Sequence, residues 1–311
     1  MDYLPFAVFV MGPTAVGKTA LAAELSRHMP CDIISVDSAM VYRGMDIGTA
    51  KPSQEFLAKA PHRLIDICDP GESYSAARFR ADALREINDI VGQRRLPLLV
   101  GGTGLYFRAL ERGLSALPSA DSAVRARLEA EAAVHGWAAL HARLREIDPP
   151  AAERISVNDP QRIQRALEVF ELTGLPMTNL QAYQAVEPFP FRVVKIIVSL
   201  DNRDELAWRI HCRFFQLLAR GFVEEVERLY RRGDLDARLP AIRAVGYRQF
   251  WEYLDGKRSY LNSVERAITA TRQYAKRQLT WLRAEENAHW LGAHDPDLVS
   301  KALKIIADGR P

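Results

Sequence analysis

Cysteine is scarce in this chain. The 311 residues include three cysteines, Cys31, Cys68 and Cys212, which lie far apart in the sequence. Their spacing fits neither a disulfide framework nor a zinc site, and so few thiols are typical of a reducing compartment. We therefore expect a cytoplasmic protein.

Long apolar runs are missing as well. No stretch of about eighteen apolar residues occurs, so we expect no membrane span. The apolar run near the N-terminus has no basic segment before it and no small-residue cleavage site after it, which indicates a buried strand and not a signal peptide. The histidines form no H-E-x-x-H motif, and we expect His135 and His141 to be solvated side chains, not metal ligands.

Excess charge is also small. The formal net charge is +3 and the isoelectric point is about 8.7, so a nucleic-acid partner would need cations gathered on one face. With 48% hydrophobic residues, the chain is long enough for one large domain or for a domain that carries an insertion. Its ordinary composition is typical of a globular enzyme.

The first third of the chain alternates apolar runs with helical patterns. Strand-like runs at 6–11, 33–36 and 97–100 are separated by helical spacing at 18–28 and 74–94. This alternation predicts a parallel α/β sheet. We expect the strand at 33–36 to lie next to the first strand.

The pattern changes after residue 118. Alanine, leucine, arginine and glutamate recur at helical spacing from about 121 to 173, and the run FRVVKIIVSL at 191–200 then has the character of a central strand. We predict a P-loop NTPase-like parallel sheet core with a mostly helical insertion domain. The core would comprise residues 1–118 and 191–311, with basic C-terminal helices, and the insertion residues 119–190.

A glycine-rich segment between the first strand and the first helix matches G-x-x-x-x-G-K-[ST] at every fixed position. In such a loop the glycines let backbone N–H groups converge on phosphate oxygens, the lysine adds a charge, and the last hydroxyl can bind Mg²⁺. Thr19 is therefore the predicted metal ligand. The predicted phosphate-binding residues are Gly12, Pro13, Thr14, Ala15, Val16, Gly17, Lys18 and Thr19.

The residues alone leave the phosphate compound open. ATP or GTP is the usual ligand, but the chain has no guanine-reading N-K-x-D, and the strand at 97–100 ends in glycine where an ATPase would carry an aspartate. Asp37 follows a strand only about twenty residues after the loop, which is early for a magnesium-anchoring residue. At the carboxyl end of a strand it could instead act on a substrate beside the phosphates.

Several further motifs follow the glycine-rich loop in a fixed order: DSAMVYRGMDIGTAKP at 37–52, PHRLID at 61–66, GGTGLY at 101–106, DPQRIQRALE at 159–168 and RAVGYRQ at 243–249. With these motifs the chain resembles the tRNA dimethylallyltransferase (tRNA isopentenyltransferase) family over nearly its whole length. It departs from the family at Met40, where glutamine is expected. It also lacks the cysteines of the zinc-finger extension found in eukaryotic relatives.

The resemblance implies a reaction. The exocyclic amine of the adenosine just 3′ of the anticodon attacks C1 of dimethylallyl diphosphate, and pyrophosphate leaves with Mg²⁺ as the cofactor. Asp37 would be the general base, Thr103 would lie near the substrate base, and Lys18 would stabilise the leaving group. We also expect the P-loop to bind a nucleotide such as ATP.

The resemblance also implies a surface for the anticodon stem-loop of tRNA. The predicted tRNA-binding residues are Asp37, Ser38, Ala39, Met40, Thr103, Arg125, Gln161, Arg162, Ile163, Gln164, Arg165, Arg243, Ala244, Val245, Gly246, Tyr247 and Arg248. Such contacts reach mainly phosphates and set position. We expect a monomer with no obligate protein partner.

Three alternatives remain at this point. The glycine-rich loop by itself favours a P-loop small-molecule kinase. An adenylate isopentenyltransferase would use the same donor with free AMP, ADP or ATP as acceptor, although the insertion and the basic C-terminal helices favour a bulky RNA. A non-catalytic RNA-binding protein could use the loop as a nucleotide switch, but the co-occurrence of Asp37 and Thr103 with the loop argues against it.

Overall fold

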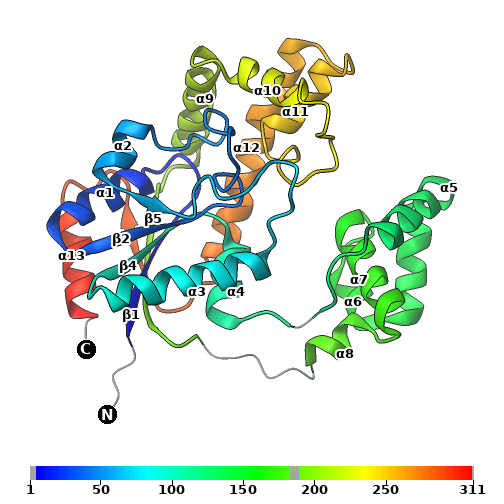
Figure 1. The fold of residues 1–311 in the computed structure, drawn as a ribbon, viewed down its shortest axis with the longest axis horizontal. Helices are drawn as coiled ribbons and strands as arrows, with labels where there is room; N and C mark the ends of the chain where they lie inside the picture. The colour runs from blue at the N-terminus through cyan, green and yellow to red at the C-terminus, as the bar shows by residue number, and fades with distance from the viewer. Residues whose placement is uncertain (1–4, 116, 183–188, 310–311) are drawn as a thin grey trace. The chain divides into compact units, whose positions relative to one another are not determined.

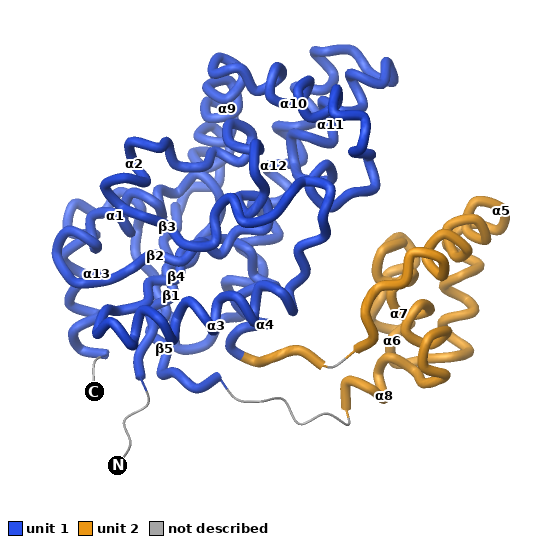
Figure 2. The backbone as a smooth tube through the Cα atoms, in the orientation of Figure 1, with its two compact units in different colours: residues 1–111, 189–311 blue, residues 112–188 orange. Residues whose placement is uncertain are grey.

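The computed structural model describes residues 5–115, 117–182 and 189–309. The chain forms two compact units, coloured separately in Figure 2. Unit 1 comprises Met1–Glu111 and Phe189–Pro311, and unit 2 comprises Arg112–Pro188. The domain boundaries at 118 and 190 stay a prediction, because compactness alone does not show which segment folds independently.

Unit 1 is built around one six-stranded sheet. Its strands are β1 (Phe6–Met11), β2 (Cys31–Val36), β3 (His62–Arg63), β4 (Leu96–Gly101), β5 (Arg192–Ser199) and β6 (Ala288–Gly292). Their order is β3-β2-β4-β1-β5-β6, and every neighbouring pair is parallel. The predicted parallel α/β core is confirmed, and β5 is the strand with which the chain returns to the sheet.

The predicted neighbour of the first strand is wrong. β4 lies between β1 and β2, so that Val100 is in register with Val10 on one side and with Ser35 on the other. All six residues of β4 are buried, as a central strand requires, whereas the order of strands along the chain does not fix their order in a sheet. Because β1, β4 and β2 end side by side, the segments that follow all three meet at one edge.

Helices cover both faces of the sheet (Figure 1). Alternate residues of β1 face opposite sides: Phe9 packs in one apolar cluster and Val8 in the other. The cluster around Val8 includes residues of α1 (Lys18–His28) and α13 (Leu298–Asp308). The cluster around Phe9 includes residues of α3 (Ala76–Gly92) and α4 (Gly104–Arg112). The short α2 (Gln54–Lys59) precedes β3.

Four further helices of unit 1 follow β5 along the chain. They are α9 (Arg203–Ala219), α10 (Phe222–Tyr230), α11 (Tyr247–Leu254) and α12 (Tyr260–Leu282). α12 contacts both α9 and α11. Phe222 joins these helices, since its ring packs edge-on against Tyr247 and Phe250. These helices therefore pack together as one group.

Unit 2 consists of α5 (Ser122–Ile147), α6 (Pro149–Arg154), α7 (Pro160–Thr173) and α8 (Met177–Ala182). α6 and α7 each begin with an aspartate N-cap followed by proline, a combination that satisfies the first amides and sets the helical φ. His141 was expected to be solvated, and that was wrong. Its ring is buried, with Nε2 3.1 Å and 2.8 Å from the carbonyl oxygens of Ala152 and Ile155, so it joins α5 to the end of α6.

Among the helices that the structure describes, none has the combined length and apolarity needed to cross a membrane.

Candidate functional site

The glycine-rich loop connects β1 to α1, as predicted, and its two motif glycines serve different purposes. A Cβ at Gly12 would lie 2.3 Å from the carbonyl oxygen of Val198, so no side chain fits beside β5. Gly17 is the N-cap of α1 with φ of 92°, a conformation in the left-handed region that favours glycine. The loop therefore turns tightly into the N-terminus of α1, the arrangement in which backbone amides and the helix end can hold a phosphate.

Lys18 is held inside this cradle. Its Nζ donates a hydrogen bond to the carbonyl oxygen of Pro13 at 2.7 Å. Burial and the nearby charge of Arg213 lower the pKa of Lys18 to about 7, while the charge of Asp37 acts in the opposite direction. An anion placed in the cradle would favour the protonated form.

Asp37 follows the end of β2, and one of its two carboxylate oxygens is hydrogen-bonded within the protein. Oδ1 accepts hydrogen bonds from the amides of Ala39 at 2.8 Å and Met40 at 3.3 Å. The amide of Ser38 donates to Oγ1 of Thr103 at 3.1 Å, so the two predicted catalytic residues lie on adjoining turns. Within the described residues, Oδ2 of Asp37 has no hydrogen-bond donor, which leaves it available to a substrate.

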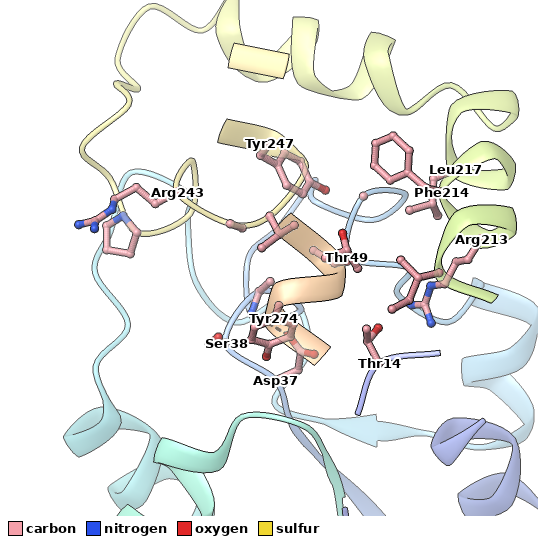
Figure 3. Close-up of a pocket in the computed structure, with 17 residues that line it drawn as sticks. Thr14, Asp37, Ser38, Thr49, Arg213, Phe214, Leu217, Arg243, Tyr247 and Tyr274 are labelled. Atoms are coloured by element: carbon pink, nitrogen blue, oxygen red, sulfur yellow. Dashed lines mark hydrogen bonds between the residues drawn. The ribbon is translucent and has the colours of Figure 1, made fainter. Parts of the chain in front are cut away.

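Two cavities meet at Asp37. The P-loop cavity, about 530 Å³, is lined by the glycine-rich loop, including Lys18 and Thr19, and by Met40 and His62. The Tyr247 cavity, about 370 Å³, is the pocket of Figure 3 and is lined by residues such as Ser38, Phe214, Arg243, Val245 and Tyr247. Six residues line both cavities: Thr14, Asp37, Thr49, Arg213, Leu217 and Tyr274. A group bound in the cradle could thus reach a second molecule in the Tyr247 cavity.

Glu225 of α10 holds one wall of the Tyr247 cavity. This side chain is buried and accepts hydrogen bonds from the amides of Asp46, Ile47 and Gly48 at 2.8–2.9 Å and from the hydroxyl of Tyr247 at 2.5 Å. The segment after β2 and the start of α11 are thereby joined through one carboxylate.

Arg213 and Tyr274 were not predicted from the sequence. Arg213 comes from α9 and Tyr274 from α12, and in Figure 3 both face the space around Asp37 and Thr14. Burial lowers the pKa of Arg213, with the charge of Asp37 opposing this effect, and burial raises the pKa of Tyr274, with the charge of Asp37 adding to it. Both residues lie within ordinary helical patterns, which carry no signal of a site.

The predicted tRNA-binding residues fall into two groups. In unit 1, Arg243, Ala244, Val245 and Tyr247 line the Tyr247 cavity, Gly246 is the N-cap of α11, and Arg248 lines an adjoining cavity of about 530 Å³. That cavity, which we call the arginine cavity, is also lined by Arg243, Arg266 and Arg277. Met40 lines the P-loop cavity.

The second group lies in unit 2, where its members have different surroundings. Arg125 and Arg165 both pair with Glu168, at 2.8 Å and 2.7 Å, and the Glu168 side chain is fully buried. Ile163 is also fully buried, in the core of the unit. Arg162 is largely exposed, and Gln164 donates to the carbonyl oxygen of Arg125. Arg125, Arg165 and Ile163 therefore stabilise unit 2, whatever they contact in RNA.

The residues of the P-loop cavity fit a magnesium ion that is held mainly by a substrate. Within the described residues, no group of three or more histidine, cysteine, aspartate or glutamate side chains could bind a metal. The hydroxyl of Thr19 and the carboxylate of Asp37 do line the cavity. Mg²⁺ commonly takes most of its ligands from phosphates and water, so this donor set is sufficient beside a diphosphate.

A parallel sheet with a glycine-rich phosphate cradle and a carboxylate at the end of the neighbouring strand defines a P-loop α/β enzyme. The family model described as IPP transferase matches residues 40–285. The chain belongs to this family.

Named relatives cover nearly the whole chain. A tRNA dimethylallyltransferase of Coxiella burnetii is 54% identical over 306 residues, 98% of this chain and of the relative. One of Thioalkalivibrio sulfidiphilus is 60% identical over 303 residues, 97% of this chain and 95% of the relative.

Solved structures agree with this assignment. The crystal structure of a full-length tRNA isopentenylpyrophosphate transferase from Bacillus halodurans has a TM-score of 0.72 and 38% identity, with 98% of this chain and 96% of that chain covered. A crystallographic structure of a eukaryotic dimethylallyltransferase acting on tRNA has a TM-score of 0.80 and 25% identity, with 99% and 80% covered.

Proposed function

We propose that this chain is a tRNA dimethylallyltransferase, which transfers the dimethylallyl group of dimethylallyl diphosphate to N6 of the adenosine immediately 3′ of the anticodon. The observation that carries the proposal is the position of Asp37 at the junction of the P-loop cavity and the Tyr247 cavity. A donor in one cavity and an acceptor base in the other would meet beside this carboxylate. The family membership of the chain supports the same reaction.

The diphosphate of the donor would occupy the P-loop cavity. Loop amides, Lys18 and Arg213 are among the groups that line this cavity and could bind its oxygens. Negative charge on the departing pyrophosphate grows as the C1–O bond breaks, so these donors and cations stabilise the transition state more than the ground state. Mg²⁺, when bound by the diphosphate and Thr19, would neutralise part of the same charge.

The adenine would occupy the Tyr247 cavity. Its exocyclic amine is a weak nucleophile, because the nitrogen lone pair is delocalised into the ring. The lone pair forms the N6–C1 bond while the C1–O electrons leave with pyrophosphate, and Oδ2 of Asp37 accepts the proton from N6. An adenine stacked in the loop could not reach this carboxylate, so it must leave the stack.

The rest of the anticodon stem-loop would lie over the arginine cavity. Arg243, Arg248, Arg266 and Arg277 line it together with Glu265, so four of its five charged side chains are cationic. Contacts of this kind neutralise backbone phosphates and position the loop. Arg125, Gln161, Arg162, Gln164 and Arg165 of unit 2 remain proposed contacts to the same RNA.

A competition among acceptors tests the proposal. Labelled dimethylallyl diphosphate and Mg²⁺ are supplied with unmodified tRNA and AMP together, and the label is followed into each. We expect label in tRNA, on the adenosine 3′ of the anticodon by nuclease digestion and mass spectrometry. Label in AMP would assign the chain to the free-nucleotide enzymes. ATP-dependent phosphorylation of a small molecule without prenyl transfer would assign it to the kinases.

A further inference from the structure

Gln278 of α12 binds the phosphate loop through a hydrogen bond. Its side chain is buried, and Oε1 accepts a hydrogen bond from the amide of Thr14 at 2.9 Å. Thr14 is the third residue of the glycine-rich motif, whose backbone N–H groups usually cradle phosphate oxygens. In this protein one backbone donor of that loop is already bound by a protein side chain.

The nitrogen end of the Gln278 side-chain amide binds the turn after β4. Nε2 of Gln278 donates to the carbonyl oxygen of Gly102 at 2.8 Å. Glutamine suits this place because it presents one acceptor and one donor on a single rigid group. The contact is close, since a Cβ at Gly102 would lie 2.2 Å from Nε2.

The turn that Gln278 binds also holds the segment that carries Asp37, the proposed general base. The amide of Thr103 donates to the carbonyl oxygen of Val36 at 3.3 Å, and Oγ1 of Thr103 accepts from the amide of Ser38 at 3.1 Å. Asp37 lies between Val36 and Ser38 in the chain. A continuous series of hydrogen bonds therefore runs from the phosphate loop through Gln278 and the 102–103 turn to the residues on both sides of Asp37.

We propose that Gln278 is a positioning residue, which fixes the distance between the diphosphate cradle and the Asp37 carboxylate. In the proposed reaction the leaving diphosphate and the proton acceptor lie on opposite sides of one reacting carbon–nitrogen pair. A displacement of about 1 Å between such groups can cost about 10²-fold in rate. The inference rests on the proposed function, but it concerns rate and not the ability of the cradle to bind phosphate.

A substitution separates these two properties. Gln278→Met keeps the volume and removes both hydrogen bonds, so the amide of Thr14 becomes free to donate to a phosphate oxygen. We expect pyrophosphate, measured with Mg²⁺ by calorimetry, to bind at least as tightly as to the wild type. The rate of transfer to tRNA in a single turnover should fall at least tenfold. A purely structural role would instead weaken binding and rate together.

A second variant tests the same contact from its other side. Gly102→Ala places a methyl group against Nε2 and should give the same pattern of retained pyrophosphate binding and reduced rate. Gln93→Met is the matched control, because Gln93 is exposed at the end of α3 and its side chain donates to the carboxylate of Asp89. It should leave both quantities unchanged.

Two results would overturn the inference. One is a transfer rate in Gln278→Met within twofold of the wild type. The other is a loss of pyrophosphate affinity that equals the loss of rate. Failure of the proposed function gives a different result, because the wild type itself would then transfer nothing to tRNA. In that case weakened pyrophosphate binding by Gln278→Met would still contradict the positioning role.

Discussion

Replacing Glu225 with glutamine should loosen one wall of the Tyr247 cavity. The carboxylate accepts four hydrogen bonds, two on each oxygen: from the Asp46 and Ile47 amides on Oε2, and from the Gly48 amide and the Tyr247 hydroxyl on Oε1. A glutamine can present its oxygen to only one of these pairs. With its NH₂ group at the Oε1 position, the Tyr247 hydroxyl can turn to accept, but the Gly48 amide loses its acceptor.

The magnitude follows from this count. One buried hydrogen bond is lost, and the others no longer reach a charged acceptor. At about 1.5–3 kcal/mol for a bond to a charged group, we expect a loss of about 2–4 kcal/mol in the free energy of unfolding. For a protein of this size that corresponds to a fall of roughly 3–6 °C in Tm.

The assay combines thermal unfolding with steady-state kinetics. Because Gly48 and Tyr247 line the acceptor side and not the P-loop cavity, KM for tRNA should rise while KM for the donor changes little. Glu224→Gln is the control, since Glu224 is the exposed neighbour on the same helix. A Tm and a KM for tRNA that both match those of the control would refute the reasoning.

Three further predictions concern charged groups. The pKa of Lys18 is lowered from 10.5 to about 7, so at a pH between these two values the Lys18 amine of the free protein is neutral. Pyrophosphate binding that restores the ammonium would then be accompanied by the uptake of a proton. Pyrophosphate affinity should therefore fall as the pH rises above about 7, and calorimetry at pH 8 in buffers of different ionisation enthalpy should detect the uptake; an absence of uptake would contradict this. Arg213→Met should weaken pyrophosphate binding about tenfold or more, the value of a charge-assisted hydrogen bond, and unchanged affinity would exclude Arg213 from the diphosphate site. For Glu168, burial alone would raise the pKa, but the hydrogen bonds from Arg125 and Arg165 more than offset it, and the net pKa is lowered. Its contribution to stability is thus present at neutral pH and lost in acid; Glu168→Gln should lower the Tm at pH 7 and remove part of the acid sensitivity, and a wild-type-like acid melting profile would contradict it.

The sequence predicted those parts of the fold that depend on local pattern. The apolar run at 6–11 and the helical spacing at 18–28 match β1 and α1 at both ends. The order of β1, β4 and β2 was missed because it depends on pairing between distant segments. His141 was misjudged for a similar reason, since its burial depends on the carbonyl groups of Ala152 and Ile155 in the next helix.

The site was predictable where a motif carries the chemistry. The phosphate loop, Asp37 and Thr103 each belong to a motif, and the structure brings them to one edge of the sheet. Arg213, Tyr274 and Gln278 come from the amphipathic helices α9 and α12. Their sequence pattern is that of any helix packed on a core, so only the tertiary structure shows that they face the cradle.

The most direct test of the account is the chemical step of Asp37→Asn. The amide keeps the size of the side chain and an oxygen for the Ala39 and Met40 amides, but it cannot accept the proton from N6. With saturating labelled dimethylallyl diphosphate and tRNA, we predict that the single-turnover rate of transfer falls by about 10²–10⁴-fold, while pyrophosphate and tRNA binding stay near those of the wild type. A single-turnover rate equal to that of the wild type would contradict the claim that transfer takes place beside Asp37, where the two cavities meet.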